Sequence, residues 1–200
     1  MTHIAIQRSA LLAVAGVLTA TAGLALMPSL RLLAPAAAVE LAQQPTSFVQ
    51  QPRLIESSTT RNLVSQLNAT YYVTLDLPAG ADVGLQTVQI RLTEGRDPIF
   101  RFRPDDTQVF EGTRYDRGTE IPVGVVTQDR DENTLTVQLD PAVLPGRTVT
   151  LALRPERNPR FEGIYLFEVT AFPAGEQVQP RFTGYARLHF YRNDRDRRLI

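Results

Sequence analysis

The chain has 200 residues, with 21 basic and 21 acidic side chains, no cysteine and no tryptophan. Every basic residue is arginine. These counts exclude thiol nucleophiles, disulfides, cysteine-based zinc sites and lysine Schiff bases. The zero formal charge argues against nucleic acid as a partner, because phosphate-binding domains are usually strongly basic. A chain of this length is expected to form one domain and a short additional segment.

The first 38 residues have the pattern of a secretory signal. Residues 1–8 carry one positive charge, and residues 9–27 run almost without polar side chains. Small residues follow at a cleavage site of the A-x-A type, ending at Ala38 or Ala42. An uncleaved apolar anchor helix is the alternative, since a bilayer requires roughly 20 apolar residues. Both interpretations place the remainder outside the cytoplasm, in the periplasm, the cell envelope or the extracellular space.

The exported part is poor in reactive side chains. Removing residues 1–38 leaves 19 arginines against 21 acidic residues, and His189 as the only histidine. Its serines all precede residue 66, and no G-x-S-x-G motif is present. Copper and zinc would find few ligands here, because they prefer His, Cys or Met. This content favours binding or scaffolding over catalysis and predicts no cofactor.

Residues 39–68 are expected to form a polar linker. The segment is punctuated by Gln-Gln-Pro at 43–45 and at 50–52. A short helix over 61–67 is the only regular element that its pattern suggests.

From residue 69 onward apolar and polar side chains alternate with a period of two, which is typical of strands with one buried and one solvated face. The pattern predicts strands over 70–77, 86–92, 99–103, 108–111, 120–127, 134–140, 148–153, 164–172 and 185–191. Turns rich in Pro and Gly separate them. We therefore expect a single antiparallel β-sandwich over 69–191, Ig-like in general shape, with a small closed barrel as the alternative. A charged tail, 192–200, follows.

One acidic stretch offers oxygen ligands for calcium. Asp129, Asp131 and Asn133 stand at alternate positions, as at the start of a calcium-binding loop. Thr134 occupies the position where that loop requires glycine, and a predicted strand follows at once. A solvated hairpin turn is the favoured interpretation.

Outward-facing side chains offer two further hypotheses. Alternation places His189 beside Arg187 on the solvated face of the last strand, where a partly exposed structural histidine is favoured over a general base or a metal ligand. Tyr72, Tyr185 and Tyr191 are also predicted to face outward, where aromatic rings could stack on sugars. Scattered carboxylates such as Glu168 could serve a hydrolase, but pairing with arginine is the simpler expectation.

Two blocks near the C-terminus carry a resemblance. Residues 163–175 read GIYLFEVTAFPAG and residues 187–191 read RLHFY. Together with 110–114, 145–149 and 157–159 they resemble a family of exported cyanobacterial proteins catalogued only as a domain of unknown function. Its motif residues here are Tyr165, Phe167, Pro173, Gly175, Arg187, His189 and Tyr191.

The resemblance spans 69–191 and implies an envelope location and one β-rich domain. It brings no activity, cofactor or catalytic residue. Ala186 departs from the glycine expected in the family, which affects only the local backbone.

The sequence thus favours an uncharacterised, exported, non-catalytic β-sandwich that binds or scaffolds an unknown component of the cell envelope. Contact with a membrane would occur only through an uncleaved N-terminal segment. A calcium- or glycan-binding module is the alternative, and a carboxylate-dependent hydrolase is a weaker one.

Overall fold

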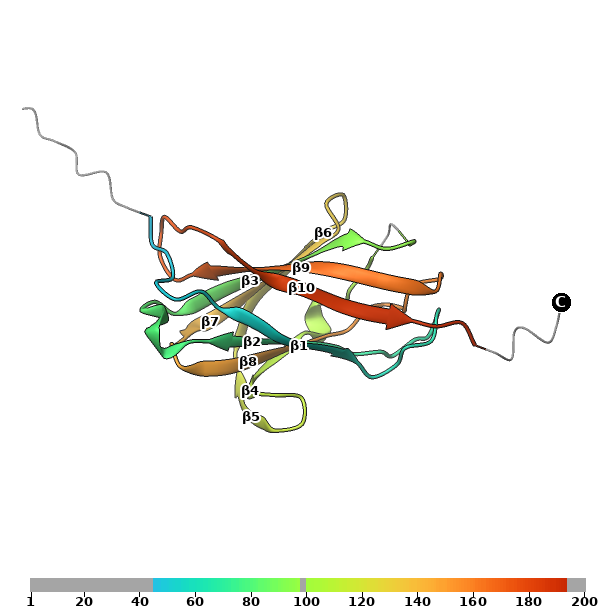
Figure 1. Cartoon of the computed structure of the whole chain (residues 1–200), viewed down its shortest axis with the longest axis horizontal. Helices are drawn as coiled ribbons and strands as arrows, with labels where there is room; N and C mark the ends of the chain where they lie inside the picture. Colours follow the sequence, from blue (N-terminus) through green and yellow to red (C-terminus); the bar gives the residue numbers. More distant parts are fainter. Residues whose placement is uncertain (1–44, 98–99, 194–200) are drawn as a thin grey trace, which may run out of the picture. The chain divides into compact units, whose positions relative to one another are not determined.

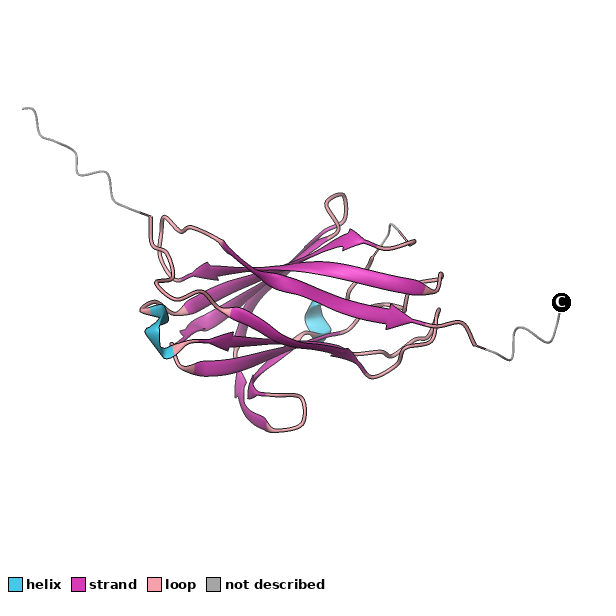
Figure 2. Ribbon diagram, viewed as in Figure 1, coloured by secondary structure: helices cyan, strands magenta, loops and turns pink. Residues whose placement is uncertain are grey.

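Two five-stranded antiparallel sheets face each other in the computed structural model, which describes residues 45–97 and 100–193 (Figures 1 and 2). The first sheet has the order β1-β2-β8-β4-β5. Its strands are β1 (Arg53–Thr59), β2 (Tyr71–Leu77), β8 (Arg147–Leu153), β4 (Gln108–Gly112) and β5 (Arg117–Ile121). The expected antiparallel β-sandwich is therefore confirmed.

The second sheet has the order β10-β9-β3-β7-β6. Its strands are β10 (Arg181–Phe190), β9 (Gly163–Pro173), β3 (Leu85–Glu94), β7 (Thr134–Val143) and β6 (Val123–Asp129). Two short 3-10 turns, η1 (Ala79–Ala81) and η2 (Pro104–Asp106), are the only helical elements among the described residues. None of the helices in that part of the chain has the length and apolar character needed to cross a membrane.

One hydrophobic core fills the space between the sheets. Its strand residues alternate with outward-facing ones, as the period of two predicts. The largest fully buried side chains are Tyr71, Tyr165, Phe110, Phe190, Leu75, Leu77, Leu85, Ile90, Leu135, Leu139, Leu151 and Leu153. All of these except Phe110 belong to the core.

The edges β1 and β10 protect each other along one side of the sandwich. Ser57 Oγ accepts a hydrogen bond from the Arg187 N–H at 3.1 Å and donates one to the Arg187 carbonyl at 3.3 Å. Gly184 lies against Leu54, whose Cβ would be 3.1 Å from an added Cβ. Exposed strand edges can pair with the strands of other chains. The contact between β1 and β10 covers one such edge of the sandwich.

On the other side, the chain passes from one sheet to the other at Pro122. The sequence pattern predicts a single strand over 120–127, and this is wrong. β5 ends at Ile121 in the first sheet and β6 begins at Val123 in the second. Proline has no N–H for a ladder hydrogen bond, so the pairing breaks at this residue.

The predicted linker 39–68 also needs correction, because much of it belongs to the domain. β1 forms an edge of the first sheet, and Phe48 is 3% exposed within the core. Gln and Pro residues surround β1 and Phe48. The apolar pattern that would predict an edge strand is therefore short and hard to recognise in the sequence.

Two further local predictions fail. The segment 61–67 is a loop rather than a helix; the Val64 N–H donates to the Tyr191 carbonyl and the Ser65 N–H to the Pro159 carbonyl. The predicted strand 99–103 contributes only an isolated bridge between Phe102 and Pro155 in its described part. The predicted signal segment, 1–38, and residues 194–200 of the charged tail lie outside the described residues.

Candidate functional site

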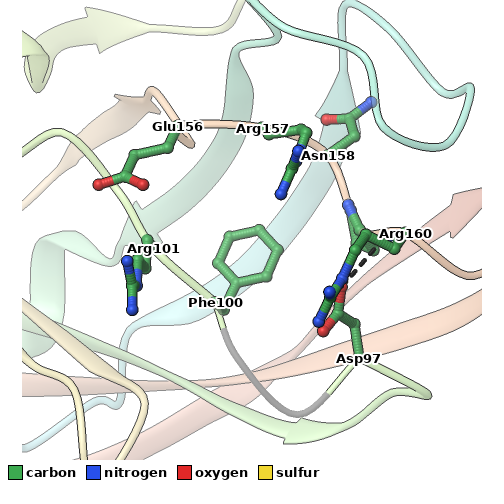
Figure 3. Close-up of a pocket in the computed structure, with 8 residues that line it drawn as sticks. Asp97, Phe100, Arg101, Glu156, Arg157, Asn158 and Arg160 are labelled. Atoms are coloured by element: carbon green, nitrogen blue, oxygen red, sulfur yellow. Dashed lines mark hydrogen bonds and ion pairs between the residues drawn. The ribbon is translucent and has the colours of Figure 1, made fainter.

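A pocket of about 240 Å³ opens where β3 and β8 end and β9 begins. We call it the arginine pocket, and its lining residues are Asp97, Phe100, Arg101, Glu156, Arg157, Asn158, Pro159 and Arg160. Figure 3 shows the ring of Phe100 between the side chains of Arg101 and Arg160, with Arg157 above it. The pocket therefore has an aromatic floor, and three guanidinium groups and the carboxylates of Asp97 and Glu156 line it.

Backbone hydrogen bonds hold the two walls of the pocket together. The Glu156 N–H donates to the Arg101 carbonyl at 2.9 Å, and the Arg103 N–H donates to the Arg154 carbonyl at 2.8 Å. These bonds pair the segment before η2 with the start of the β8–β9 loop.

A glutamine on β6 fixes the floor. Gln128 Nε2 donates to the Phe100 carbonyl at 2.7 Å, and Gln128 Oε1 accepts from the Phe102 N–H at 3.1 Å. The Phe100 ring then packs into the aromatic core, with its centroid 5.0 Å from Phe167 and 5.7 Å from Tyr71. Phe100 is only 3% exposed, so a rigid part of the core supports the pocket.

Asn158 anchors the β8–β9 loop from below. It is 1% exposed, and its Oδ1 accepts a hydrogen bond from the Tyr71 hydroxyl at 2.9 Å. Its Nδ2 donates to the carbonyls of Arg61 and Leu63 at 3.0 and 2.8 Å. Burial raises the pKa of Tyr71 well above its usual range, so the hydroxyl remains a donor.

Tyr165 connects the two sides of the pocket through hydrogen bonds of its hydroxyl group. Its hydroxyl accepts from the Asp97 N–H at 3.1 Å and donates to the Phe161 carbonyl at 3.0 Å. Burial raises the pKa of Tyr165, and the hydrogen bond from the Asp97 N–H offsets only part of that rise. Gly95 lies flat against this ring; a Cβ there would be 2.3 Å from Tyr165 Cδ1.

Charge is distributed unevenly around the pocket. Asp97 Oδ2 accepts from the Arg160 N–H at 3.0 Å and faces Arg160 Nε at 3.4 Å. The guanidinium groups of Arg101 and Arg157 make no hydrogen bond or ion pair with any described residue, and both residues are exposed. Guanidinium groups bind carboxylate and phosphate oxygens through paired N–H donors. The arrangement can hold an oxyanion above the Phe100 floor.

A second depression, of about 500 Å³, lies on the outer face of the second sheet. We call it the sheet-face groove, and its lining residues are Gln89, Arg91, Thr127, Asp129, Glu132, Thr134, Thr136 and Glu168. The expected arginine pairing of Glu168 is confirmed, since Arg91 Nη2 lies 3.0 Å from its carboxylate.

The three calcium candidates occupy the β6–β7 turn, as the hairpin interpretation predicts. Asp129 Oδ1 accepts from the N–H groups of Asp131 and Glu132 at 2.9 and 3.1 Å. Asn133 Oδ1 accepts from the Phe100 N–H at 3.3 Å. Within the described part of the chain, no three His, Asp or Glu side chains lie together as a metal site would need. Calcium binding at this turn remains a prediction.

The family motif residues do not meet at one site. Tyr165, Phe167 and Pro173 are buried, whereas Arg187, His189 and Tyr191 are exposed on or beside β10. Gly175 has φ +149° in the turn that follows β9, where a side chain would be strained.

The aromatic residues predicted to face outward have separate surroundings. His189 faces solvent beside Tyr191, with ring centroids 4.2 Å apart. Tyr185 is 51% exposed and contacts Phe182 edge-on at 5.0 Å. Tyr72 faces outward on the other sheet, beneath the guanidinium of Arg114 at 5.2 Å.

The arginine pocket itself is not predicted from the sequence. Residues 157–159 stand out only as part of the family resemblance, and Arg101 falls within a predicted strand. Arg101 and Arg157 lie far apart in the chain, so no local spacing signals that they share a rim.

A family model described as "Protein of unknown function (DUF2808)" matches residues 45–190. Among curated proteins, none matches the chain.

Solved structures with a similar fold include the C-terminal domain of the Streptococcus pyogenes antigen I/II-family protein AspA, at 12% identity and a TM-score of 0.42. That match covers 68% of this chain and 46% of that one, so this chain spans less than half of its length. A collagen-binding domain from a Staphylococcus aureus adhesin matches at 6% identity and TM-score 0.36, covering 68% and 97% of the two chains.

A cohesin module from a Clostridium perfringens family 33 glycoside hydrolase matches at 9% identity and TM-score 0.32, covering 70% of this chain and 99% of that one. The sandwich is established by the strand pairing described above, which these structures resemble only in outline.

Proposed function

The chain belongs to DUF2808, a family of unknown function, and we propose that it is a non-catalytic binding or scaffolding domain of the cell envelope. In this proposal the arginine pocket holds an oxyanion, a carboxylate or phosphate group of an envelope component. The observation that carries the proposal is the pair of exposed guanidinium groups on Arg101 and Arg157, which form no ion pair with any described residue.

The frame beneath these arginines supports binding. Asn158, Tyr165 and Gln128 hold the loop backbones through buried or half-buried hydrogen bonds. A preorganised site loses less conformational entropy when a ligand binds. The two free guanidinium groups would then offer charge-assisted hydrogen bonds, each contributing about 1.5–3 kcal/mol.

Titration with inorganic phosphate and with citrate, followed by amide chemical shifts of the labelled domain, tests the pocket. We expect shifts around 100–103 and 156–160. The double variant Arg101→Gln/Arg157→Gln should bind at least about tenfold more weakly, since two charge-assisted bonds are lost. The matched control Arg53→Gln/Arg130→Gln removes the same charge from exposed positions elsewhere and should bind normally.

Two results would overturn the oxyanion site. One is the absence of shifts in the pocket with both anions. The other is equal weakening in the two double variants, which would indicate a general effect of net charge. Phosphate binding without citrate binding would assign the pocket to phosphate groups, and the reverse would assign it to carboxylates.

The envelope location rests on the leader pattern of residues 1–38. Fractionation of cells producing the full chain with a C-terminal tag tests it. We expect the protein outside the cytoplasm, with a new N-terminus after Ala38 or Ala42 or, for a retained anchor, in the membrane fraction. Recovery from the cytoplasm with Met1 intact would contradict export.

A further inference from the structure

Two complete rows of side chains cross the outer face of the second sheet. Strand register places the members of each row directly opposite one another on neighbouring strands from β10 to β6. The first row is Tyr185, Glu168, Arg91, Thr134 and Asp129. The second row is Phe182, Thr170, Gln89, Thr136 and Thr127.

Each row begins with an exposed aromatic residue. Phe182 is 50% exposed and Tyr185 51% exposed, and their rings meet edge-on at 5.0 Å. The bulge between Phe182 and Gly184 brings both rings to the same face of β10. They form an aromatic ledge at one end of the sheet-face groove, and large apolar surface of this kind is costly to leave in water.

The groove beyond the ledge is lined by hydrogen-bonding groups. The side chains of Gln89, Thr127 and Thr136 make no hydrogen bond with any residue the structure describes, so their donors and acceptors are available. The Arg91–Glu168 pair adds a guanidinium and a carboxylate at the centre of the floor. Hydroxyl, amide and carboxylate groups together can donate and accept bonds along the whole groove.

The charge of the groove restricts its occupant. The lining includes three carboxylates, on Asp129, Glu132 and Glu168, against the single guanidinium of Arg91. An anionic polymer would be repelled, whereas sugar hydroxyls are good donors to carboxylate oxygens. The rings of the ledge match the apolar C–H faces of pyranose units. Neighbouring strands lie about 4.8 Å apart, so four spacings give a platform about 19 Å long, enough for several sugar units.

We propose that this face binds a neutral glycan chain, with the ledge of Phe182 and Tyr185 stacking on one sugar and the threonine, glutamine and carboxylate groups of the groove bonding those that follow. The site is separate from the arginine pocket and goes beyond its proposed role. A domain with both sites would connect a glycan to an anionic envelope component.

Calorimetric titration of the domain with cellohexaose, chitohexaose and maltohexaose tests the inference. We expect at least one hexasaccharide to bind at micromolar to millimolar concentration. Tyr185→Ala should weaken binding roughly tenfold or more, as truncation of a hot-spot aromatic residue does, while Tyr185→Phe should retain most of it. Thr136→Val preserves side-chain shape, removes one hydroxyl and should also weaken binding.

Two controls separate this site from general effects. Tyr115→Ala removes a tyrosine that is even more exposed, 79% against 51% for Tyr185, from the β4–β5 turn of the other sheet and should bind normally. Arg101→Gln/Arg157→Gln should also bind normally, so the two proposals can fail independently. Circular dichroism and thermal melting verify that each variant is folded.

Three outcomes would overturn the proposal. The first is that none of the three sugars binds at millimolar concentration. The second is that Tyr185→Ala and Tyr115→Ala bind equally well. The third is a dimer in solution that Tyr185→Ala dissociates, which would make this face a contact between two copies of the chain.

Discussion

The hydroxyl of Tyr71 on β2 donates a hydrogen bond to Asn158 Oδ1 in the β8–β9 loop at 2.9 Å, inside the core. Asn158 in turn satisfies the carbonyls of Arg61 and Leu63. One buried amide thus connects a sheet, the loop of the arginine pocket and the segment before β2. A buried polar network of this kind is stabilising only while every member has its partner.

Removing the donor should therefore be costly. Tyr71→Phe leaves Asn158 Oδ1 buried without that hydrogen bond, and we expect the free energy of unfolding to fall by about 1–3 kcal/mol. Urea denaturation measures this loss. Tyr72→Phe is the matched control, because the Tyr72 hydroxyl makes no hydrogen bond with the described residues and should be dispensable. Equal midpoints for the two variants would contradict the role of the network.

The two buried tyrosines beneath the arginine pocket, Tyr71 and Tyr165, predict a loss of stability in alkali. Burial raises the pKa of Tyr71 and of Tyr165 above the ordinary tyrosine value of about 10. The contribution of these tyrosines to the free energy of unfolding is fully present below pH about 10. It is lost as the pH rises from there toward the pKa of the folded state, because the tyrosines ionise more easily in the unfolded chain.

Urea titrations from pH about 8 to about 11 should show this decline, with each tyrosine contributing up to about 1.4 kcal/mol per pH unit. Tyr71→Phe should decline less steeply, since one of the two groups is gone. A stability that stays constant above pH about 10 would contradict the prediction.

Gly95 should tolerate no side chain. An added Cβ would lie 2.3 Å from Cδ1 of the buried Tyr165 ring, so Gly95→Ala forces ring or backbone to move. We expect a loss of about 1–3 kcal/mol in urea denaturation. In Gly80→Ala the new Cβ meets only the end of the exposed Gln50 side chain, which can move away. The prediction is wrong if both variants are equally stable.

Arg117 on β5 shields an aromatic ring that lies outside the main core. Its guanidinium lies 4.4 Å from the ring centroid of Phe110, which is 1% exposed on the outer face of the first sheet. Arg117→Ala should cost about 0.5–2 kcal/mol through the lost cation–π contact and the uncovered ring. Arg53→Ala, an exposed arginine on β1, should have little effect; a similar loss there would indicate that charge alone matters.

Strand periodicity made much of the fold predictable. Alternation identified the buried faces of β2, β3, β7, β8, β9 and β10, because the side-chain direction along a strand depends only on local backbone geometry. It also placed Asp129 in a hairpin turn and His189 on the outer face of β10. It failed for β1, where polar residues mask an edge strand, and at Pro122, where the chain changes sheets.

Neither candidate site could be located in this way. Alternation predicts that Tyr185 faces outward. Its position opposite Glu168 depends on the register of three strands, as does the alignment of Glu168 with Arg91. Register is determined when the sheets assemble around their core, and it is not readable from any one strand.

By itself the sequence determined the residue chemistry, the period-two strands, the leader pattern and the family resemblance, because these depend on composition and local order. Only the tertiary structure decided which side chains meet. Folding brings Arg101 and Arg157 to the same pocket and aligns the rows of the sheet-face groove, since long-range backbone pairing and core packing bring together residues that are distant in the chain.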